Sequence, residues 1–155
     1  MGRVYPLSRR QLLAGAGGLA LGLCGIAARA DDATPLRLGV LTDMSSLYAD
    51  ITGPGSLAAA KMAVEDFQAS PHKMTRPIEV LSGDHMNKAD LGANIAREWI
   101  DRNNVDAIID VPNSAVALAV RNVVQQANKT LLVSRSMLSE LCADGSPTYS
   151  RASAP

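Results

Sequence analysis

Hydrophobic residues follow two alternating patterns between residues 36 and 133. Short, largely apolar runs have the length expected of strands buried on both faces, and they cover residues 36–41, 77–81, 105–111 and 130–133. Between these runs, apolar residues recur every three or four positions, as on one face of a helix. The recurring residues are Leu57, Ala60, Val64 and Phe67, then Leu91, Ile95, Ala96, Trp99 and Ile100, then Val116, Ala119, Val120, Val123, Val124 and Ala127. The pattern predicts the order β-α-β-α-β-α-β.

This alternation predicts the α/β class, with a doubly wound parallel sheet that carries helices on both faces. The connections between parallel strands should be right-handed. In such sheets, ligands bind outside the carboxyl ends of the strands, where the strand order reverses. Four loops follow predicted strand ends, and they are rich in Ser, Asn, Asp and Thr: residues 43–48, 82–87, 111–114 and 134–136. These side chains suit hydrogen bonding to a ligand better than acid-base chemistry.

The unit from residue 105 to residue 134 is the clearest strand-helix-strand segment. Its first turn contains Asn113 and Ser114, which can cap the helix that follows. The first amide groups of a helix have no partners within the helix, so a capped helix start beside a parallel strand suits a small anion such as a carboxylate. A well-capped helix without a ligand is the alternative that the unit itself leaves open.

Residues 1–30 have the features of an export signal. Arg9 and Arg10 precede a weakly hydrophobic segment rich in Gly and Ala, which is typical of the twin-arginine class, although the ordinary secretory route stays open. Small residues at Ala28 and Ala30 predict cleavage after Ala30 and a periplasmic location. A membrane anchor is disfavoured because the segment is short for a bilayer span. A lipoprotein is disfavoured because Leu23, rather than a small residue, precedes Cys24.

Composition and charge narrow the class of protein further. The chain has 155 residues, which suits one domain, and 47% of them are hydrophobic but only 3% aromatic. The formal net charge is zero, but four of the 15 basic residues lie in residues 1–30, which leaves 11 basic against 15 acidic residues in the rest of the chain. Neither a nucleic-acid partner nor attachment to anionic lipid is expected from this distribution.

Catalytic and cofactor motifs have no support in the sequence. Of the two histidines, His72 lies in a polar loop, and His85 follows Asp84 without a further His or Cys at metal-ligand spacing. No phosphate-binding loop, dinucleotide fingerprint or nucleophile elbow is present. The sequence therefore predicts a protein that is not an enzyme, with no metal and no cofactor.

Two stretches carry a family resemblance. LRLGVLTDMSSLYADITGPGSLAAAKMAVEDF, from Leu36, and PIEVLSGDHMNKADLGANIAREWIDRNNVDAIIDVPNSAVALAV, from Pro77, resemble the amino-terminal part of type I periplasmic substrate-binding proteins. The branch they resemble is that of the leucine/isoleucine/valine-binding proteins of ABC importers. The resemblance implies a two-lobed, hinged protein that closes on a branched-chain amino acid or a related carboxylate and delivers it to a membrane permease.

The resemblance also implies which residues bind the ligand. Ser114 matches the serine that holds the ligand carboxylate, and Asn113 supports it from the adjacent position. Ser134 and Ser136 match the loop after the fourth strand, which offers hydroxyl and backbone groups. Tyr48 matches the first loop, which contributes a ring or backbone contact. Asp84 is expected to be structural.

The chain departs from the resembled family after Ser134. The family implies a second lobe, whereas residues 31–136 suffice only for part of the amino-terminal lobe, and residues 137–155 lack an apolar period, which predicts a disordered tail. A frameshifted or prematurely stopped gene is the simplest interpretation, with a short module or an incomplete sequence as alternatives. A sensory or regulatory ligand-binding domain of the same fold and a non-functional gene remnant are the alternative functions.

Overall fold

All strands of the structure belong to one parallel sheet. The computed structural model describes residues 34–135 and 149–151, so the predicted export signal lies outside the described residues. The strands are β1 (Leu36–Thr42), β2 (Ile78–Asp84), β3 (Ala107–Asp110), β4 (Thr130–Val133) and β5 (Tyr149–Arg151), and the helices are α2 (Gly53–Ala69), α3 (Ala89–Asp101) and α4 (Ser114–Gln126). The sheet order is β2-β1-β3-β4-β5, and every pair is parallel. The predicted α/β class with a parallel sheet is therefore confirmed.

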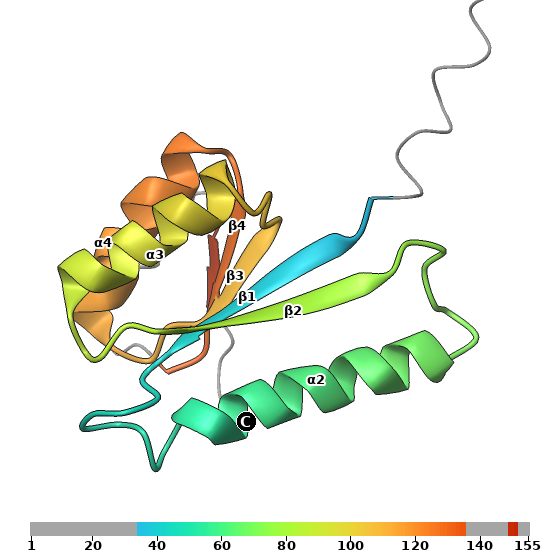
Figure 1. Ribbon diagram of the computed structural model, residues 1–155, viewed down its shortest axis with the longest axis horizontal. Coiled ribbons are helices and arrows are strands. Elements are labelled where there is room, and N and C mark those ends of the chain that lie inside the picture. The colour runs from blue at the N-terminus through green and yellow to red at the C-terminus, as the bar shows by residue number, and fades with distance from the viewer. Residues whose placement is uncertain (1–33, 136–148, 152–155) are drawn as a thin grey trace, which may run out of the picture. The chain divides into compact units, whose positions relative to one another are not determined.

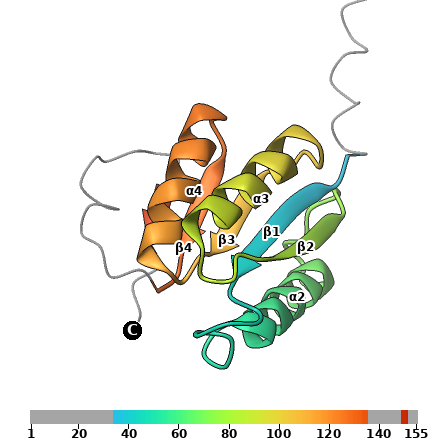
Figure 2. The same cartoon turned by 60° about the vertical axis from the view of Figure 1, so that its left-hand side comes forward.

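The direction of winding changes at β1. The chain passes from β1 to its neighbour β2 and then returns across β1 to form β3 on the other side. Helix α2 lies on one face of the sheet, while α3 and α4 lie side by side on the other face (Figures 1 and 2). Right-handed crossovers that run in opposite directions require opposite faces. The order thus reverses on either side of β1, and the crevice expected in doubly wound sheets opens at the carboxyl ends of β1 and β3.

The hydrophobic core lies between the sheet and the pair α3 and α4. Leu41, Ile108 and Leu131 from three adjacent strands are fully buried there, and α4 adds Val116, Val120 and Val124. Trp99 of α3 covers the strands as the sequence predicted. On this face, the apolar residues of the predicted strands pack against the apolar residues of the predicted helices.

The face of the sheet covered by α2 is less well packed than the face covered by α3 and α4. Gly53 is the one buried residue of α2, whereas Phe67 keeps 36% of its surface exposed and Leu132 of β4 keeps 41%. Part of the predicted helical stripe borders an apolar hollow above Leu38 and Ile109 rather than filling it. The predicted helix is present, but its apolar stripe is only partly buried, because α2 follows the part of the sheet near β1 and β2 and, among the described elements, leaves β4 uncovered on this face.

The strands differ from the sequence pattern in their bounds and in one additional strand. Strand β2 continues through Ser82 to Asp84, where a loop was predicted, because it stays in register with β1 up to the pair Thr42 and Asp84. Strand β3 has four residues instead of seven. Within the tail predicted to be disordered, Tyr149–Arg151 pairs with β4 as β5. The unpaired edge of β4 offers backbone groups for such pairing.

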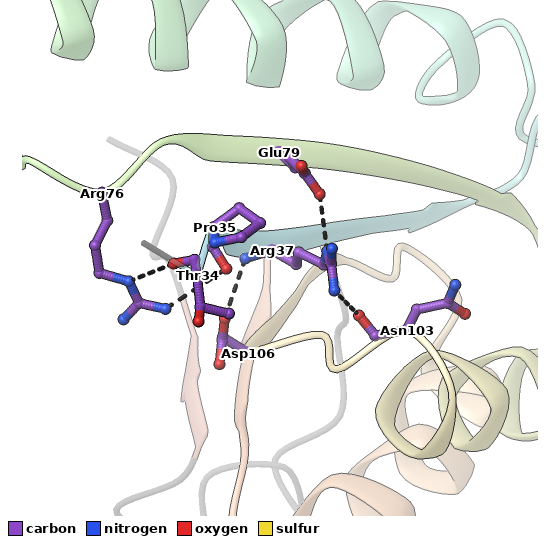
Figure 3. A network of polar contacts seen from close by, with 7 residues as sticks. All are labelled: Thr34, Pro35, Arg37, Arg76, Glu79, Asn103 and Asp106. Carbon is purple, nitrogen blue, oxygen red and sulfur yellow. Dashed lines mark hydrogen bonds and ion pairs between the residues drawn. The ribbon is translucent and has the colours of Figure 1, made fainter. Parts of the chain in front are cut away.

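A polar network fastens the amino-terminal edge of the sheet (Figure 3). The Arg37 guanidinium donates to Glu79 on β2 at 2.8 Å and to the Asn103 carbonyl at 2.9 Å, while the Arg37 amide donates to Asp106 at 3.1 Å. Arg76 donates to the Thr34 carbonyl at 2.8 Å. These contacts tie β1 to β2 and to the loop before β3 at the edge opposite the predicted crevice, so the polar residues of this edge serve the sheet itself.

Candidate functional site

Most of the predicted binding residues lie along one edge of the sheet. Tyr48 follows β1, Asn113 and Ser114 follow β3, and Ser134 follows β4. Since the strands are parallel, these carboxyl ends meet at the same edge, where α2, α3 and α4 also begin (Figure 1). Ser136 lies outside the described residues.

The start of α4 has the geometry of an anion-binding helix terminus. The Asn113 side-chain oxygen accepts a hydrogen bond from the Val116 amide at 3.0 Å, which confirms the predicted cap. Ser114 is the first helical residue and is half-buried, and the first turn carries no acidic side chain. A Cβ on Gly92 of α3 would lie 2.5 Å from the Val116 side chain, so glycine there allows α3 to support this turn closely. The helix start is thus held on two sides.

The backbone that leads from β3 to α4 is strained. Asp110 has φ +81° and Val111 has φ +44°, a conformation that is a genuine outlier for a β-branched residue. Val111 is fully buried, and its amide donates to the Leu41 carbonyl of β1 at 3.0 Å. Tertiary contacts therefore hold a conformation that costs roughly 1–3 kcal/mol, and such strain concentrates at ligand sites.

The loop after β1 is built on Asp43. This buried carboxylate accepts hydrogen bonds from the Ser46 amide at 2.8 Å, the Ser46 hydroxyl at 2.6 Å and the Tyr48 amide at 2.9 Å. Burial raises the pKa of the Asp43 carboxyl, but these hydrogen bonds outweigh it, so the pKa is held below its usual value. The Tyr48 carbonyl in turn accepts from Thr52 at the start of α2. Tyr48 is half-buried, and its backbone connects the loop to the helix.

Asp84, the last residue of β2, performs a similar structural role, which is the role that the family resemblance implied. It accepts hydrogen bonds from the Met44 amide at 3.0 Å, from the Ser45 hydroxyl at 2.5 Å and from the Met86 amide at 2.8 Å. Burial raises the pKa of Asp84, whereas these hydrogen bonds lower it and prevail. Asp84 therefore joins the loops that follow β1 and β2.

Two residues of the β2 loop were not predicted to matter. His85 is fully buried, and its Nδ1 accepts a hydrogen bond from the Asn87 amide at 3.0 Å. The Asn87 side-chain oxygen accepts from the Asn113 side-chain amide, which links this loop to the cap of α4. The weak sequence signal for Asn87 is its residue type, because Asn tolerates positive φ and Asn87 has φ +57°.

His85 remains neutral more readily than an exposed histidine. Burial lowers its pKa, and the charges of Asp43, Asp84 and Asp110 oppose this effect without cancelling it. Since Nδ1 accepts a hydrogen bond, the neutral ring carries its proton on Nε2, a buried atom with no partner among the described residues. His85 thus supports the loop rather than acting as an acid or base.

Ser134 is already engaged within the protein. Its hydroxyl donates to an Asp110 side-chain oxygen, and its amide donates to the Asp110 carbonyl at 3.0 Å. The hydroxyl oxygen retains lone pairs, so in this arrangement Ser134 is an acceptor for a ligand rather than a donor.

An open hollow of about 320 Å³ lies next to these residues on the α2 side of the sheet. Its lining includes Val40, Ile109, Asp110, Ser134 and Ser56 of α2. Among residues 34–135 and 149–151, no group of three or more His, Cys, Asp or Glu side chains is arranged to hold a metal. None of the helices in these ranges has the length and apolar character needed to cross a bilayer. At this edge, the polar side chains of Asp110 and Ser134 therefore lie beside a hollow that is lined by apolar residues such as Val40 and Ile109.

The Asp43 loop predicts how stability depends on pH. Because the folded pKa of Asp43 lies below its unfolded value, its stabilising contribution is present above about pH 4 and is lost as the pH falls through the folded pKa. We expect Asp43→Asn to lower the free energy of unfolding by about 1–3 kcal/mol at neutral pH. The difference from the unsubstituted chain should narrow at about pH 2.

Urea denaturation at both pH values checks this expectation. The control is Asp50→Asn, an exposed position in the same loop, which should change the unfolding free energy little at either pH. A gap between Asp43→Asn and the unsubstituted chain that stayed constant from neutral pH to about pH 2 would contradict the role assigned to the carboxylate.

Comparisons with known proteins agree with this architecture. The model of the family described as "Periplasmic binding protein" matches residues 35–152. A periplasmic binding protein from Burkholderia mallei is 41% identical with a TM-score of 0.68, and the match covers 74% of this chain and 30% of that one. A branched chain amino acid ABC transporter periplasmic ligand-binding protein from Burkholderia xenovorans is 42% identical with a TM-score of 0.62, covering 68% of this chain and 28% of that one.

A more distant solved structure shares the fold. The solute-binding protein of an ABC transporter from R. palustris, in complex with 4-hydroxybenzoate, is 22% identical with a TM-score of 0.61, covering 76% of this chain and 31% of that one. A search of curated proteins finds no match. The chain thus spans about a third of the length of these solved relatives.

Proposed function

The chain belongs to the periplasmic binding protein family, and from this premise we propose that it forms part of the amino-terminal lobe of a solute-binding component of an ABC importer. The family and fold are those of substrate-binding proteins rather than enzymes. The solute is a small carboxylate, of which a branched-chain amino acid is the preferred candidate, and the importer's membrane permease receives it.

The observation that carries this proposal is the start of α4. A capped helix terminus lies at the carboxyl end of β3, beside the reversal of strand order, and Ser114 is its first residue. The partial positive charge at a helix start suits a carboxylate. Asp43 and Asp84, which would repel an anion, are each occupied by three hydrogen bonds from their own loops.

The ligand class is supported by the names of the relatives. The Burkholderia xenovorans protein, at 42% identity, is named for branched-chain amino acids. The R. palustris protein holds 4-hydroxybenzoate, an aromatic acid, on the same fold. Both classes of ligand present a carboxylate, so Ser114 and the start of α4 suit either class. The higher sequence identity to the Burkholderia xenovorans protein favours the amino acid.

Export to the periplasm belongs to the same proposal. The family is periplasmic, and residues 1–30 carry the twin-arginine pattern with Ala28 and Ala30 before the expected cleavage point. Sequencing the amino terminus of the protein recovered from the periplasm should give Asp31 as the first residue.

Substitution of Ser114 tests the site. We use a two-lobed chimera in which residues 34–134 of this chain replace the matching part of the Burkholderia mallei relative. Loss of a hydrogen bond to a charged group costs about 1.5–3 kcal/mol, so Ser114→Ala should weaken leucine binding roughly 10- to 100-fold by calorimetry.

The matched control is Ser70→Ala, at the far end of α2. Its hydroxyl donates to the Phe67 carbonyl at 2.7 Å, away from the predicted crevice. Ser70→Ala should leave the leucine affinity unchanged. Equal affinities for Ser114→Ala and the unsubstituted chimera would reject Ser114 as a ligand contact.

A further inference from the structure

The loop after β2 adopts a conformation that needs external support. Met86 and Asn87 are consecutive residues with φ +48° and +57°, a region that costs non-glycine residues free energy. The Met86 amide donates to Asp84, the Asn87 amide donates to Nδ1 of His85, and the Lys88 amide donates to the His85 carbonyl at 2.8 Å. The buried imidazole and the Asp84 carboxylate therefore fix the direction in which the Asn87 side chain leaves the backbone.

From this fixed position, Asn87 reaches the cap of α4. Its side-chain oxygen accepts a hydrogen bond from the Asn113 side-chain nitrogen, while the Asn113 side-chain oxygen accepts from the Val116 amide at 3.0 Å. An Asn cap needs its oxygen toward the helix, and an acceptor opposite its nitrogen favours that one orientation over the flipped one. Asn87 supplies this acceptor from another loop, 26 residues away in sequence.

The connection runs from a buried side chain to the proposed ligand site. Successive hydrogen bonds join His85, Asn87, Asn113 and the first turn of α4, in which Ser114 is the first residue. The strained residues Asp110 and Val111 precede this turn. The orientation of the Asn113 cap at the start of α4 therefore depends on the β2 loop.

We propose that Asn87 is a positioning residue for the ligand carboxylate, acting through Asn113 on the start of α4. This inference rests on the proposed function, since it assumes that the carboxylate binds at Ser114. Asn87 need not touch the ligand. It fixes the cap before the ligand arrives, so less ordering remains to be done on binding.

The test uses the full 155-residue chain and the substitution Asn87→Gly. Glycine permits the positive φ and retains the amide that donates to His85, so it removes the side chain without forcing the backbone out of this conformation. The matched control is Asn104→Gly, at an exposed position with φ +50° near the amino-terminal edge of the sheet. Amide NMR spectra follow titration with leucine and with leucinamide, which lacks the carboxylate, and thermal melts check folding.

We expect Asn87→Gly to weaken leucine binding at least threefold, judged from the Ser114 and Val116 amides, with leucinamide binding unchanged. The Asn113 side-chain resonances should move before ligand is added, and Asn104→Gly should change none of these readouts. Unchanged leucine affinity in Asn87→Gly, with leucine shifting Ser114 in the unsubstituted chain, overturns the positioning role and leaves the proposed function intact. If leucine does not shift the Ser114 amide resonance in the unsubstituted chain, the proposed function is wrong, and this inference is then wrong as well.

Discussion

The 155-residue chain should bind leucine, isoleucine and 4-hydroxybenzoate no more tightly than about 1 mM, whereas the two-lobed chimera should bind its ligand about 1,000-fold more tightly. Ligand sites bury most of the ligand surface, and hinged proteins achieve this by closing one lobe on the other. The hollow beside Asp110 and Ser134 is open. A ligand held only at the α4 terminus therefore keeps one face in water and competes with water for every hydrogen bond.

Isothermal calorimetry on both proteins, in the same buffer, measures this difference. A factor of 1,000 corresponds to about 4 kcal/mol of binding free energy. Leucinamide serves as the control ligand for both proteins, since it lacks the carboxylate that the α4 start is proposed to hold. Micromolar leucine binding by the 155-residue chain would refute the view that this lobe supplies one half of the site.

Gly39→Ala should be strongly destabilising, and more so than the same methyl addition at Gly83, the other glycine in the described strands. A Cβ on Gly39 of β1 would lie 2.3 Å from Cζ3 of Trp99, far inside van der Waals contact. The same ring also lies close to Gly83 of the neighbouring β2, where an added Cβ would be 2.8 Å from it, so the indole packs closely over both glycines. Overpacking of this kind costs about 1–3 kcal/mol, and we expect the upper end of the range.

Trp99 itself reports the outcome. It is the one tryptophan of the chain and is 8% exposed, so displacement from the sheet should shift its fluorescence to longer wavelength. Gly55→Ala is the matched control, because nothing lies within 4 Å of its added Cβ. The double variant Gly39→Ala with Trp99→Leu should lose less stability than the two single losses added together. Unchanged urea denaturation and fluorescence in Gly39→Ala would contradict the packing described.

The sequence predicted those parts of the fold that depend on the side chains of one segment of the chain. Four apolar runs and three helical periods are enough to indicate a parallel α/β sheet, and Asn113 before an apolar helix is enough to indicate a cap. The end of β3 at Asp110 was not predictable, because apolar Val111 follows in the sequence while the backbone changes to positive φ at Asp110. Hydrophobic periodicity carries no information about φ. The poor burial of α2 depends on where the helix lies over the sheet, which its own stripe does not specify.

The candidate site was predictable only to the level of its loops. Alternation places the carboxyl ends of β1, β3 and β4 at one edge, which brings Tyr48, Ser114 and Ser134 to that edge. The engagement of Ser134 by Asp110 and the link from Asn87 to Asn113 join residues 24 and 26 positions apart. His85 is buried because β2 stays paired with β1 as far as Asp84. Such contacts arise from strand register, which a single sequence does not state.

The central claim is that the carboxyl edge of this sheet, at the start of α4, holds the carboxylate of a small ligand. Amide NMR spectra of the full chain at increasing leucine concentration test it most directly. We predict that the largest shifts occur at Ser114, Val116 and residues 44–48, that residues 103–106 at the opposite edge stay unchanged, and that leucinamide produces much smaller shifts. Shifts concentrated at residues 103–106, or equal shifts with leucinamide, would contradict it.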